Sequence, residues 1–254
     1  MTHQKPEKPI GQKSYGSIGH LPGSRKGPKD IGMSASQAAI CLTKARDRHD
    51  TVIVQEKLDG SNVCVANVDG QLIALGRSGH PAMSSNLEHH KLFAAWVNHH
   101  RELFEFLLPG QRLCGEWLAQ AHGTIYNLHH APFVAFDLIS GAWDRHTYDD
   151  MRSTIHPDIV TPAILHRGGP CSIEQAMRAL NTTGFHGATE PAEGAVWRVE
   201  RLGKVLFLAK YVREDKVDGK YLVRDGKVLP PTWLYRWSDL PKAETPAPLQ
   251  GAEG

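Results

Sequence analysis

A lysine stands at the end of a strand-forming run and two residues before a turn. Val52-Ile53-Val54 is a β-branched run typical of a buried strand, and Asp59-Gly60 is a typical turn pair. We therefore expect Lys57 to lie where a core strand gives way to a loop, with its stem packed and its amine facing a cleft. A lysine in such a position can have a lowered pKa and act as a nucleophile.

The same pattern also fits a simpler interpretation, a surface lysine beside a hairpin turn. A second tetrad of the same form, Lys216-Val217-Asp218-Gly219, occurs later in the chain. The tetrad alone therefore does not identify a nucleophile. The order of the other charged residues along the chain is needed to distinguish the two lysines.

The composition is that of an ordinary globular protein. Its 254 residues suffice for one large core or two modest ones. A net charge of +2 with neutral histidines does not indicate a nucleic-acid binder, although it is compatible with a local basic groove. No apolar run is long enough to span a membrane, and the polar start lacks the apolar region of a signal peptide.

The cysteines and histidines do not predict a metal centre. The four cysteines show no Cys-x-x-Cys spacing, which argues against a zinc site and a disulfide framework. Histidines occur in the pairs His89-His90, His99-His100 and His129-His130. Adjacent residues on a helix do not share a face, so we expect solvated histidines on helix and loop surfaces rather than a metal-binding protein. The setting predicted from these features is reducing and cytoplasmic, with no membrane association and a monomeric chain.

Alternating strand and turn signals dominate the middle of the chain. Asp69-Gly70 between two strand-like segments predicts a type I′ hairpin. Ser172 and Gln175 fit a capping box that opens a short helix. We expect strands near 52–57, 62–68, 71–75, 112–118, 133–139, 193–198 and 205–212, and helices near 36–46, 87–108 and 173–180.

The two ends of the chain have a different composition from its middle. Residues 1 to about 35 are rich in Gly, Pro, Lys and Ser, which predicts a loop-rich arm, either an ordered loop laid on the domain or a mobile arm, and not a core element. Residues 223–254 are Pro-rich, and we expect a short appendage and a disordered tail there. The main domain is accordingly predicted to span residues 1–222.

The informative pattern is an ordered set of charged residues at strand ends. Its members are Lys57, Arg77, Glu116, Glu193 and Lys210, each flanked by glycine or apolar residues. Glu116 lies inside a strand that otherwise looks buried, where a carboxylate is costly unless it meets a cation.

This ordered set resembles the covalent nucleotidyltransferase superfamily of DNA ligases, RNA ligases and mRNA capping enzymes. The segments similar to its motifs I, Ia, III, IIIa, IV and V are Lys57-Leu58-Asp59-Gly60-Ser61-Asn62, Gly76-Arg77-Ser78-Gly79, Gly115-Glu116-Trp117, residues 133–138, Glu193-Gly194-Ala195-Val196-Trp197-Arg198 and Leu208-Ala209-Lys210. No such series of carboxylate-bearing strands follows Lys216. The resemblance implies an α+β fold, an ATP-grasp-like nucleotidyltransferase domain of two antiparallel sheets flanked by helices, with no OB-fold.

Within this superfamily the chain is most similar to the RNA ligase branch, of the RNA ligase 2 type. Asn62 stands at the sixth position of motif I, where DNA ligases and capping enzymes usually carry arginine. The other branches also append an OB-fold, for which too few residues follow residue 222. Residues 17–25 are similar to the start of small RNA-ligase-like proteins.

The resemblance implies a reaction on ATP assisted by Mg²⁺ or Mn²⁺. Lys57 would attack the α-phosphate of ATP to form a lysine–AMP intermediate. Neutralising an ordinary lysine at pH 7 costs about 4 to 5 kcal/mol. We expect Lys210 or a metal ion to lower the pKa of Lys57 through its positive charge. Lys210 would also offset triphosphate charge, and Glu193 and Glu116 would hold the metal or its waters.

Further residues are expected around the nucleotide and the RNA ends. Phe136 would stack on adenine, and the backbone near Glu56 would read the amino group of the base. Arg77 and Asn62 would engage ribose or phosphate, and Glu116 is a second candidate for the ribose. AMP would then pass to a 5′-phosphate end, which a 3′-hydroxyl would join, with a nicked duplex among the conceivable substrates.

Several alternatives stay open at the level of sequence. Motif V usually has two lysines separated by one residue, whereas Lys210 has none at the paired position, and Arg213 or Lys204 could compensate. Asp59 could be only a turn residue and Phe136 only core. Arg198 and Arg213 could pair with carboxylates or line an RNA groove. Rival functions are a minimal DNA or nick ligase, a capping-like enzyme using GTP, and an end-binding protein without turnover.

Overall fold

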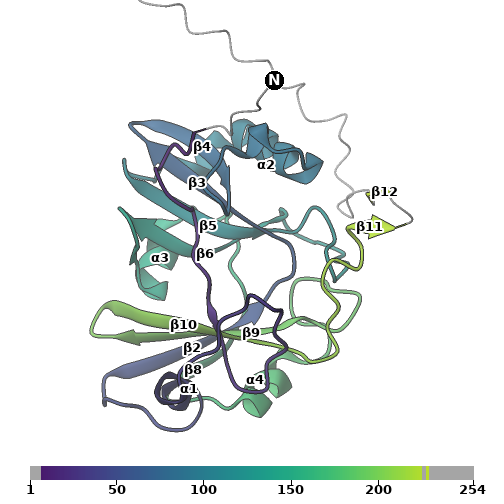
Figure 1. The fold of residues 1–254 in the computed structure, drawn as a ribbon. Helices are drawn as coiled ribbons and strands as arrows, with labels where there is room; N and C mark the ends of the chain where they lie inside the picture. Colours follow the sequence, from purple (N-terminus) through teal and green to yellow (C-terminus); the bar gives the residue numbers. More distant parts are fainter. Residues whose placement is uncertain (1–6, 225–226, 229–254) are drawn as a thin grey trace, which may run out of the picture.

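The protein is built on two five-stranded sheets that lie one above the other and whose strands are not in sequence order (Figure 1). A computed structural model describes residues 7–224 and 227–228. The first sheet has the strand order β1-β10-β9-β2-β8, with β1 (Gly19–His20), β10 (Lys204–Val212), β9 (Gly194–Arg201), β2 (Asp50–Lys57) and β8 (Ile164–Gly168). The second has the order β4-β3-β5-β6-β7, with β4 (Gln71–Gly76), β3 (Ser61–Val68), β5 (Gln111–Trp117), β6 (Phe133–Ser140) and β7 (Asp144–Arg145).

All strand pairs in the two sheets are antiparallel except one. The exception is β1, which pairs in parallel with β10. The chain crosses between the sheets through the three residues 58–60, from the end of β2 to the start of β3. Both sides of that crossing are paired: Lys57 lies opposite Gly194 of β9, and Asn62 lies opposite Glu116 of β5. This crossing places the ends of four strands at one cleft.

Helices cover the outer faces of the sheets. The helix α2 (Glu88–His99) packs Phe93 and Trp96 against Trp117 and Phe133 of the second sheet. The first sheet is covered by α1 (Ala35–Leu42) and α4 (Ile173–Leu180), which pack around the fully buried Trp197. The remaining elements are η1 (Ala82–Ser84), η2 (Arg101–Phe104), α3 (Tyr148–Thr154), β11 (Val223–Arg224) and β12 (Lys227–Val228).

Local sequence signals explain where several elements begin and turn. Ser172 and Gln175 form the reciprocal capping box expected at the start of α4. Asp69 and Gly70 both have positive φ, 50° and 87°, as a type I′ hairpin requires. The strands predicted from these signals all form. The fold is thus the predicted α+β arrangement of two sheets flanked by helices.

Other details differ from the sequence predictions. The helix predicted over 87–108 is interrupted, because α2 ends at His99 and a separate 3-10 turn follows. The short elements β7, α3 and β8, which lie between residues 144 and 168, were not predicted from the sequence. After β10 the described residues add only the β11–β12 ribbon and therefore contain no OB-fold. The predicted tail after residue 228 lies outside the described residues.

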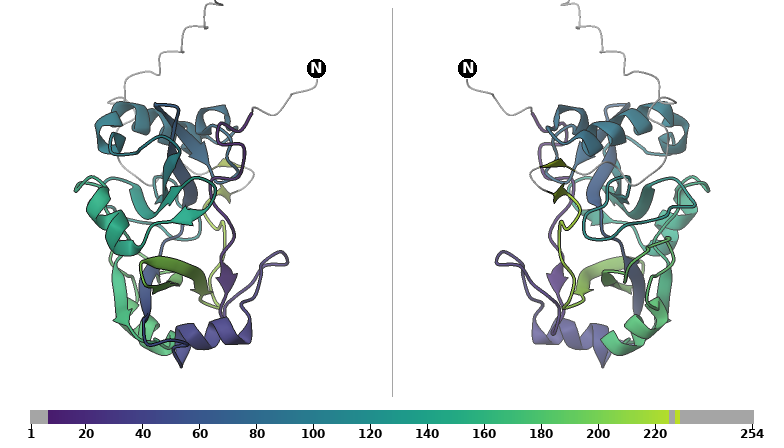
Figure 2. Two further views of the ribbon diagram at one scale, coloured as in Figure 1. Left: turned by 90° about the vertical axis from the view of Figure 1, so that its left-hand side faces the viewer. Right: turned by 90° about the vertical axis from the view of Figure 1, so that its right-hand side faces the viewer.

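The described part of the N-terminal arm is an ordered segment laid on the domain, the first of the two alternatives, but contrary to the prediction some of its side chains enter the core. Tyr15 and Leu21 are buried, and the arm runs across both sheets (Figures 1 and 2). Leu21 packs in the core of the first sheet and Tyr15 in a cluster on the second. The glycine and proline content of the arm is typical of a loop, but its few apolar side chains pack against both sheets.

Among the helices of the described residues, none is both long enough and apolar enough to cross a membrane.

Candidate active site

A cavity of about 1870 Å³ opens between the two sheets at the crossing from β2 to β3. Elements of both sheets contribute to its wall, together with the N-terminal arm and the segment after β10. The lining contains all eight residues predicted from the sequence: Glu56, Lys57, Asn62, Arg77, Glu116, Phe136, Glu193 and Lys210. Charged residues that are far apart in the sequence are therefore brought together in one cavity.

Lys57 is held by an ion pair at the floor of this cavity. Its Nζ lies 2.6 Å from Oε2 of Glu193, the residue immediately before β9. The pairing of Lys57 with Gly194 across the sheet fixes this approach. The Lys57 side chain is 21% exposed and that of Glu193 is 7% exposed, so the amine meets the cavity while its partner is buried.

The prediction of a lowered pKa for Lys57 is wrong for this state of the site. Burial alone would lower the pKa of Lys57, but the charges of Glu193 and Glu116 and the hydrogen bond to Glu193 raise it to about 12. Neutralising the amine at pH 7 therefore costs about 7 kcal/mol. The pKa of Lys210 is shifted in the opposite direction: burial and the charge of Lys57 lower it.

Glu116 and Asn62 face the cavity from neighbouring strands of the second sheet. The backbone N–H of Gly60 donates to Oε1 of Glu116 at 3.0 Å, which ties the turn after Lys57 to β5. Burial raises the pKa of Glu116 to about 7 against the opposing charge of Lys57. Oδ1 of Asn62 is buried without a hydrogen-bond partner, which is costly unless a ligand supplies one.

The turn after Lys57 requires glycine for a steric reason. A Cβ atom on Gly60 would lie 2.5 Å from the carbonyl oxygen of Trp117. The close approach of the two backbones keeps Lys57 and Glu116 on the same wall of the cavity.

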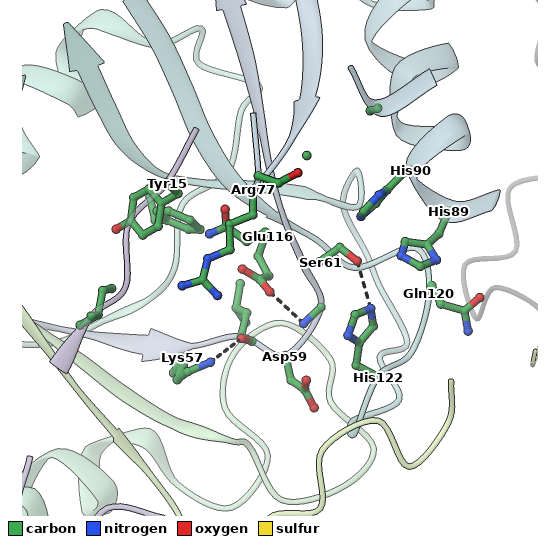
Figure 3. A pocket seen from close by; sticks show the side chains of 18 of the residues that line it. Tyr15, Lys57, Asp59, Ser61, Arg77, His89, His90, Glu116, Gln120 and His122 are labelled. Carbon is green, nitrogen blue, oxygen red and sulfur yellow. Dashed lines mark hydrogen bonds between the residues drawn. The ribbon is translucent and has the colours of Figure 1, made fainter. Parts of the chain in front are cut away.

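Phe136 and Arg77 form a second wall together with the N-terminal arm. Phe136 lies edge-on to Tyr15, with ring centroids 5.1 Å apart. The Arg77 carbonyl accepts from the N–H groups of Ser14 and Tyr15, and its guanidinium donates to the Gly16 carbonyl at 3.1 Å. Figure 3 shows Tyr15 and Arg77 on the same side of the cavity as Glu116 and Lys57. The arm thus belongs to the site, which the sequence did not reveal.

Glu56 directs its side chain away from Lys57. Its Oε2 accepts from the N–H of Phe185 at 3.0 Å, while Oε1 is buried without a partner. Burial raises the pKa of Glu56 to about 7. A Cβ on Gly184, whose φ is +65°, would lie 2.0 Å from this carboxylate, so the loop at 184–185 closes over it.

Lys216, the lysine of the second tetrad, does not line the cavity but contacts Asp59, which does. Its Nζ lies 2.7 Å from Oδ2 of Asp59 and also bonds Thr124, and its side chain is 4% exposed. Asp59 accepts a further hydrogen bond from the N–H of Gly123 at 2.9 Å. Asp59 is therefore more than a turn residue, because it joins motif I to two distant loops.

The residues proposed to compensate for the single motif V lysine lie elsewhere. Lys204 begins β10 at the hairpin with β9 and does not line the cavity. Arg213 contacts Asp215 at 3.5 Å. Arg198 is buried and pairs with Asp137, and it also lines the cavity, so the carboxylate pairing does not rule out its other alternative. Lys216 is an additional buried lysine next to the cavity and contacts Asp59 of its lining.

The donor groups at the site fit a hydrated divalent ion that also binds substrate oxygens. Glu116 and Glu193 offer carboxylate oxygens, and Mg²⁺ typically takes one or two carboxylates while keeping several waters. No group of three or more His, Cys, Asp or Glu side chains in the described part of the chain has the arrangement of a metal cage. Burial raises the pKa of Glu193, although the charge of Lys57 opposes this, so a cation would favour its ionised form.

The prediction that the histidine pairs are solvated is wrong for one pair. His89 and His90 line the cavity, and His122 joins them from the loop after β5. Ring centroids of His89 lie 4.7 Å from those of His90 and 5.7 Å from those of His122. Helical spacing alone could not reveal this contact, because the third ring comes from another element.

Of the comparisons with known proteins, one identifies a family and another identifies structures of similar fold. The family model for RNA ligase matches residues 50–212. No curated protein sequence matches the chain significantly. A solved structure of a Naegleria gruberi RNA ligase mutant with ATP and Mn is similar at a TM-score of 0.51 and 18% identity, covering 78% of this chain and 60% of that one. A second such mutant with ATP and Mn gives a TM-score of 0.50 and 19% identity, covering 83% and 61%.

The matched structures are longer than the part that aligns with this chain. The chain spans about three fifths of both Naegleria gruberi structures. An archaeal ATP-dependent RNA ligase is similar at 21% identity with a TM-score of 0.41, covering 65% of this chain and 43% of that one.

The Asp59–Lys216 contact generates a testable prediction about the frame of the site. Lys216→Met should lower the free energy of unfolding by about 3 kcal/mol, because it leaves a mostly buried carboxylate without its ion pair. The double variant Asp59→Asn/Lys216→Met should recover most of this loss. Denaturant unfolding measures both, with Lys204→Met as the control for a lysine outside the cavity. A loss below about 0.5 kcal/mol for Lys216→Met, as at exposed ion pairs, would contradict the assignment.

Proposed function

The chain belongs to the RNA ligase family, and on that premise we propose that it is an ATP-dependent RNA ligase that works through a lysine–AMP intermediate on Lys57. The observation that carries the proposal is the amine of Lys57, which reaches the cavity from a strand end while the buried Glu193 holds it at 2.6 Å. Cations and carboxylates drawn from both sheets surround this amine, as a reaction on a triphosphate requires.

In the proposed first step, Nζ of Lys57 attacks the α-phosphorus of ATP. A nitrogen–phosphorus bond forms, the bond to the β-phosphate oxygen breaks, pyrophosphate leaves and the amine loses a proton. The raised pKa of Lys57 means that Glu193 must release the amine before it can react. A bound Mg²⁺ or Mn²⁺ would offset the negative charge that develops on the phosphates. Glu193 and Glu116 are the residues proposed to hold it.

Two further steps complete the proposed cycle. An oxygen of an RNA 5′-phosphate attacks the phosphorus of lysine–AMP, and the nitrogen–phosphorus bond breaks to regenerate Lys57. The 3′-hydroxyl oxygen then attacks the 5′-phosphorus, its proton leaves, and AMP departs as the phosphoanhydride bond breaks. Lys210 and Arg77, which line the same cavity, are the proposed partners of the phosphates.

The nucleoside of ATP is proposed to lie against the wall formed by Phe136 and the arm. Phe136 offers an aromatic face next to Tyr15, to which a purine can stack. The unpartnered Oδ1 of Asn62 can accept from a ribose hydroxyl. The carboxylate of Glu116 is a second candidate for the ribose, and the backbone at Glu56 is the proposed reader of the amino group of adenine.

The proposal extends to the domain organisation of the chain and to its substrate. We propose that residues 1–222 form the nucleotidyltransferase domain and that 223–254 are an appendage to it. The protein would act as a monomer in the cytoplasm on RNA ends, including those of a nicked duplex. The reduced, buried state of all four cysteines is compatible with a reducing setting.

The nucleophile can be tested by labelling. Incubation with ATP labelled in its α-phosphate and with Mg²⁺ should leave AMP covalently attached to the native protein and to Lys204→Ala, whose exposed lysine lies outside the cavity. Lys57→Ala should carry no label, because no other lysine amine in the described residues has the same position before a turn at the cavity floor. Label retained on Lys57→Ala would contradict the assignment.

The pH dependence of the first step follows from the two shifted groups. With a pKa of about 12 for Lys57, the neutral fraction of the amine increases about tenfold for each unit by which the pH rises, as long as the pH stays below that value. Glu116 has a pKa of about 7 and becomes ionised over the neutral range. The rate of lysine–AMP formation at saturating ATP and Mg²⁺ should therefore rise from pH 6 to pH 9. A rate that is constant or falls across this range would refute the assigned protonation states.

A further inference from the structure

One end of the cavity is lined by a set of uncharged polar side chains. We define the histidine compartment as Ser61, His89, His90, Gln120 and His122, which all line the cavity. Figure 3 shows these five residues on the opposite side of the cavity from Tyr15 and Arg77. They come from three elements: the start of β3, the first turn of α2 and the loop after β5.

The imidazole rings of the compartment are held in place by their neighbours. Nε2 of His122 lies 3.0 Å from Oγ of Ser61, and Nδ1 of His90 lies 3.0 Å from Oγ of Ser85. His89 lies between the other two rings and is 6% exposed. The compartment is therefore a preformed aromatic surface.

Charge distinguishes this compartment from the rest of the cavity. Burial lowers the pKa of all three histidines, that of His89 to about 4, so their rings are neutral at pH 7. The lining residues between 78 and 90 and between 120 and 122 include no lysine or arginine, whereas Lys57, Arg77 and Lys210 line the other side. A phosphate would find its counter-charges there and not in the histidine compartment.

The size of the cavity indicates that one nucleotide does not fill it. Pockets for single small molecules typically measure roughly 300 to 1,000 Å³, and this cavity measures about 1870 Å³. On the proposed function, the second occupant is an RNA end. The 5′ end brings a phosphate, which the cationic side favours. The 3′ end presents an uncharged hydroxyl on a terminal nucleoside, which suits the neutral compartment.

We propose that the histidine compartment binds the 3′-terminal nucleoside of the RNA strand that is joined, with its base packed on the imidazole rings. Unstacked bases at RNA ends are commonly bound by aromatic side chains, histidine among them. Ser61 begins the strand after the turn that follows Lys57, and both residues line the cavity, so this proposal places the terminal hydroxyl toward the side of the compartment nearest Lys57. This inference rests on the proposed function and specifies how its second substrate is held.

The test uses the last step alone. An RNA donor with a preformed 5′-adenylylated end is offered together with a 3′-hydroxyl RNA acceptor, so that neither ATP nor lysine–AMP formation enters the rate. Two acceptors are compared: one with a normal terminal nucleotide and one whose terminal ribose lacks its base. With the native full-length protein at acceptor concentrations below saturation, sealing of the abasic acceptor should be about tenfold slower, since a base–aromatic stack typically contributes this much or more.

Variants then assign the effect to the compartment. His122→Ala should slow sealing of the normal acceptor about tenfold and reduce the difference between the two acceptors to less than about twofold. His122→Phe, which keeps an aromatic face, should retain most of that difference. His99→Ala is the matched control, because His99 is an exposed histidine on the same helix α2 and does not line the cavity.

The outcomes separate this inference from the proposed function. Equal sealing of both acceptors by the native protein would overturn the inference even if every variant failed to fold. So would an equal tenfold penalty in His122→Ala and native protein, or a penalty that appears only when the base is removed from the donor's 5′ nucleotide. Absence of any sealing, together with absence of lysine–AMP, would overturn the proposed function itself and the inference with it.

Discussion

The ion pair between Lys57 and Glu193 is the interaction on which the rest of the site depends. It joins the last residue of β2 to the residue before β9, and so fixes the amine at the point where the chain leaves one sheet for the other. A mostly buried charge is tolerated only when it is paired, so each partner constrains the other. Two lysines near this pair also have carboxylate partners: Lys216 contacts Asp59 at 2.7 Å, and Lys210 lies 4.0 Å from Asp30.

This pairing has a consequence for reactivity. A lysine among carboxylates is held in its protonated form, which protects the amine from reaction until something competes for Glu193. In the proposed mechanism a divalent cation accompanying ATP is that competitor, because it attracts the same carboxylate oxygens. The nucleophile would then become available only together with its substrate. The same site divides into a cationic side for phosphates and a neutral histidine compartment for a nucleoside, so charge alone can sort the two substrates.

The residues that sequence could predict are those whose position is set locally. Lys57 lies at a strand end because of the β-branched run before it and the Asp59-Gly60 turn after it, and the order of the charged strand ends carried the family resemblance. His122 had no such signal, and the tetrad at Lys216 did not reveal its contact with Asp59, because both residues lie in loops whose course depends on distant contacts such as that of Thr124 with Lys216. The direction of the pKa shift of Lys57 also escaped prediction, since it depends on the 2.6 Å approach of a residue 136 positions away.

The central claim, that carboxylates hold Lys57 as an ammonium in the free protein, is tested most directly by titrating this one side chain. NMR of a protein labelled with ¹³C at the lysine ε-carbons, with the Lys57 signal assigned by its loss in Lys57→Arg, follows the protonation of the amine up to pH 11. At a pH near 10.4, where an ordinary lysine is about half neutral, Lys57 should remain mostly protonated in the native protein. Glu193→Gln should lose that protonation at lower pH. A native Lys57 that is already mostly neutral at this pH would contradict the account.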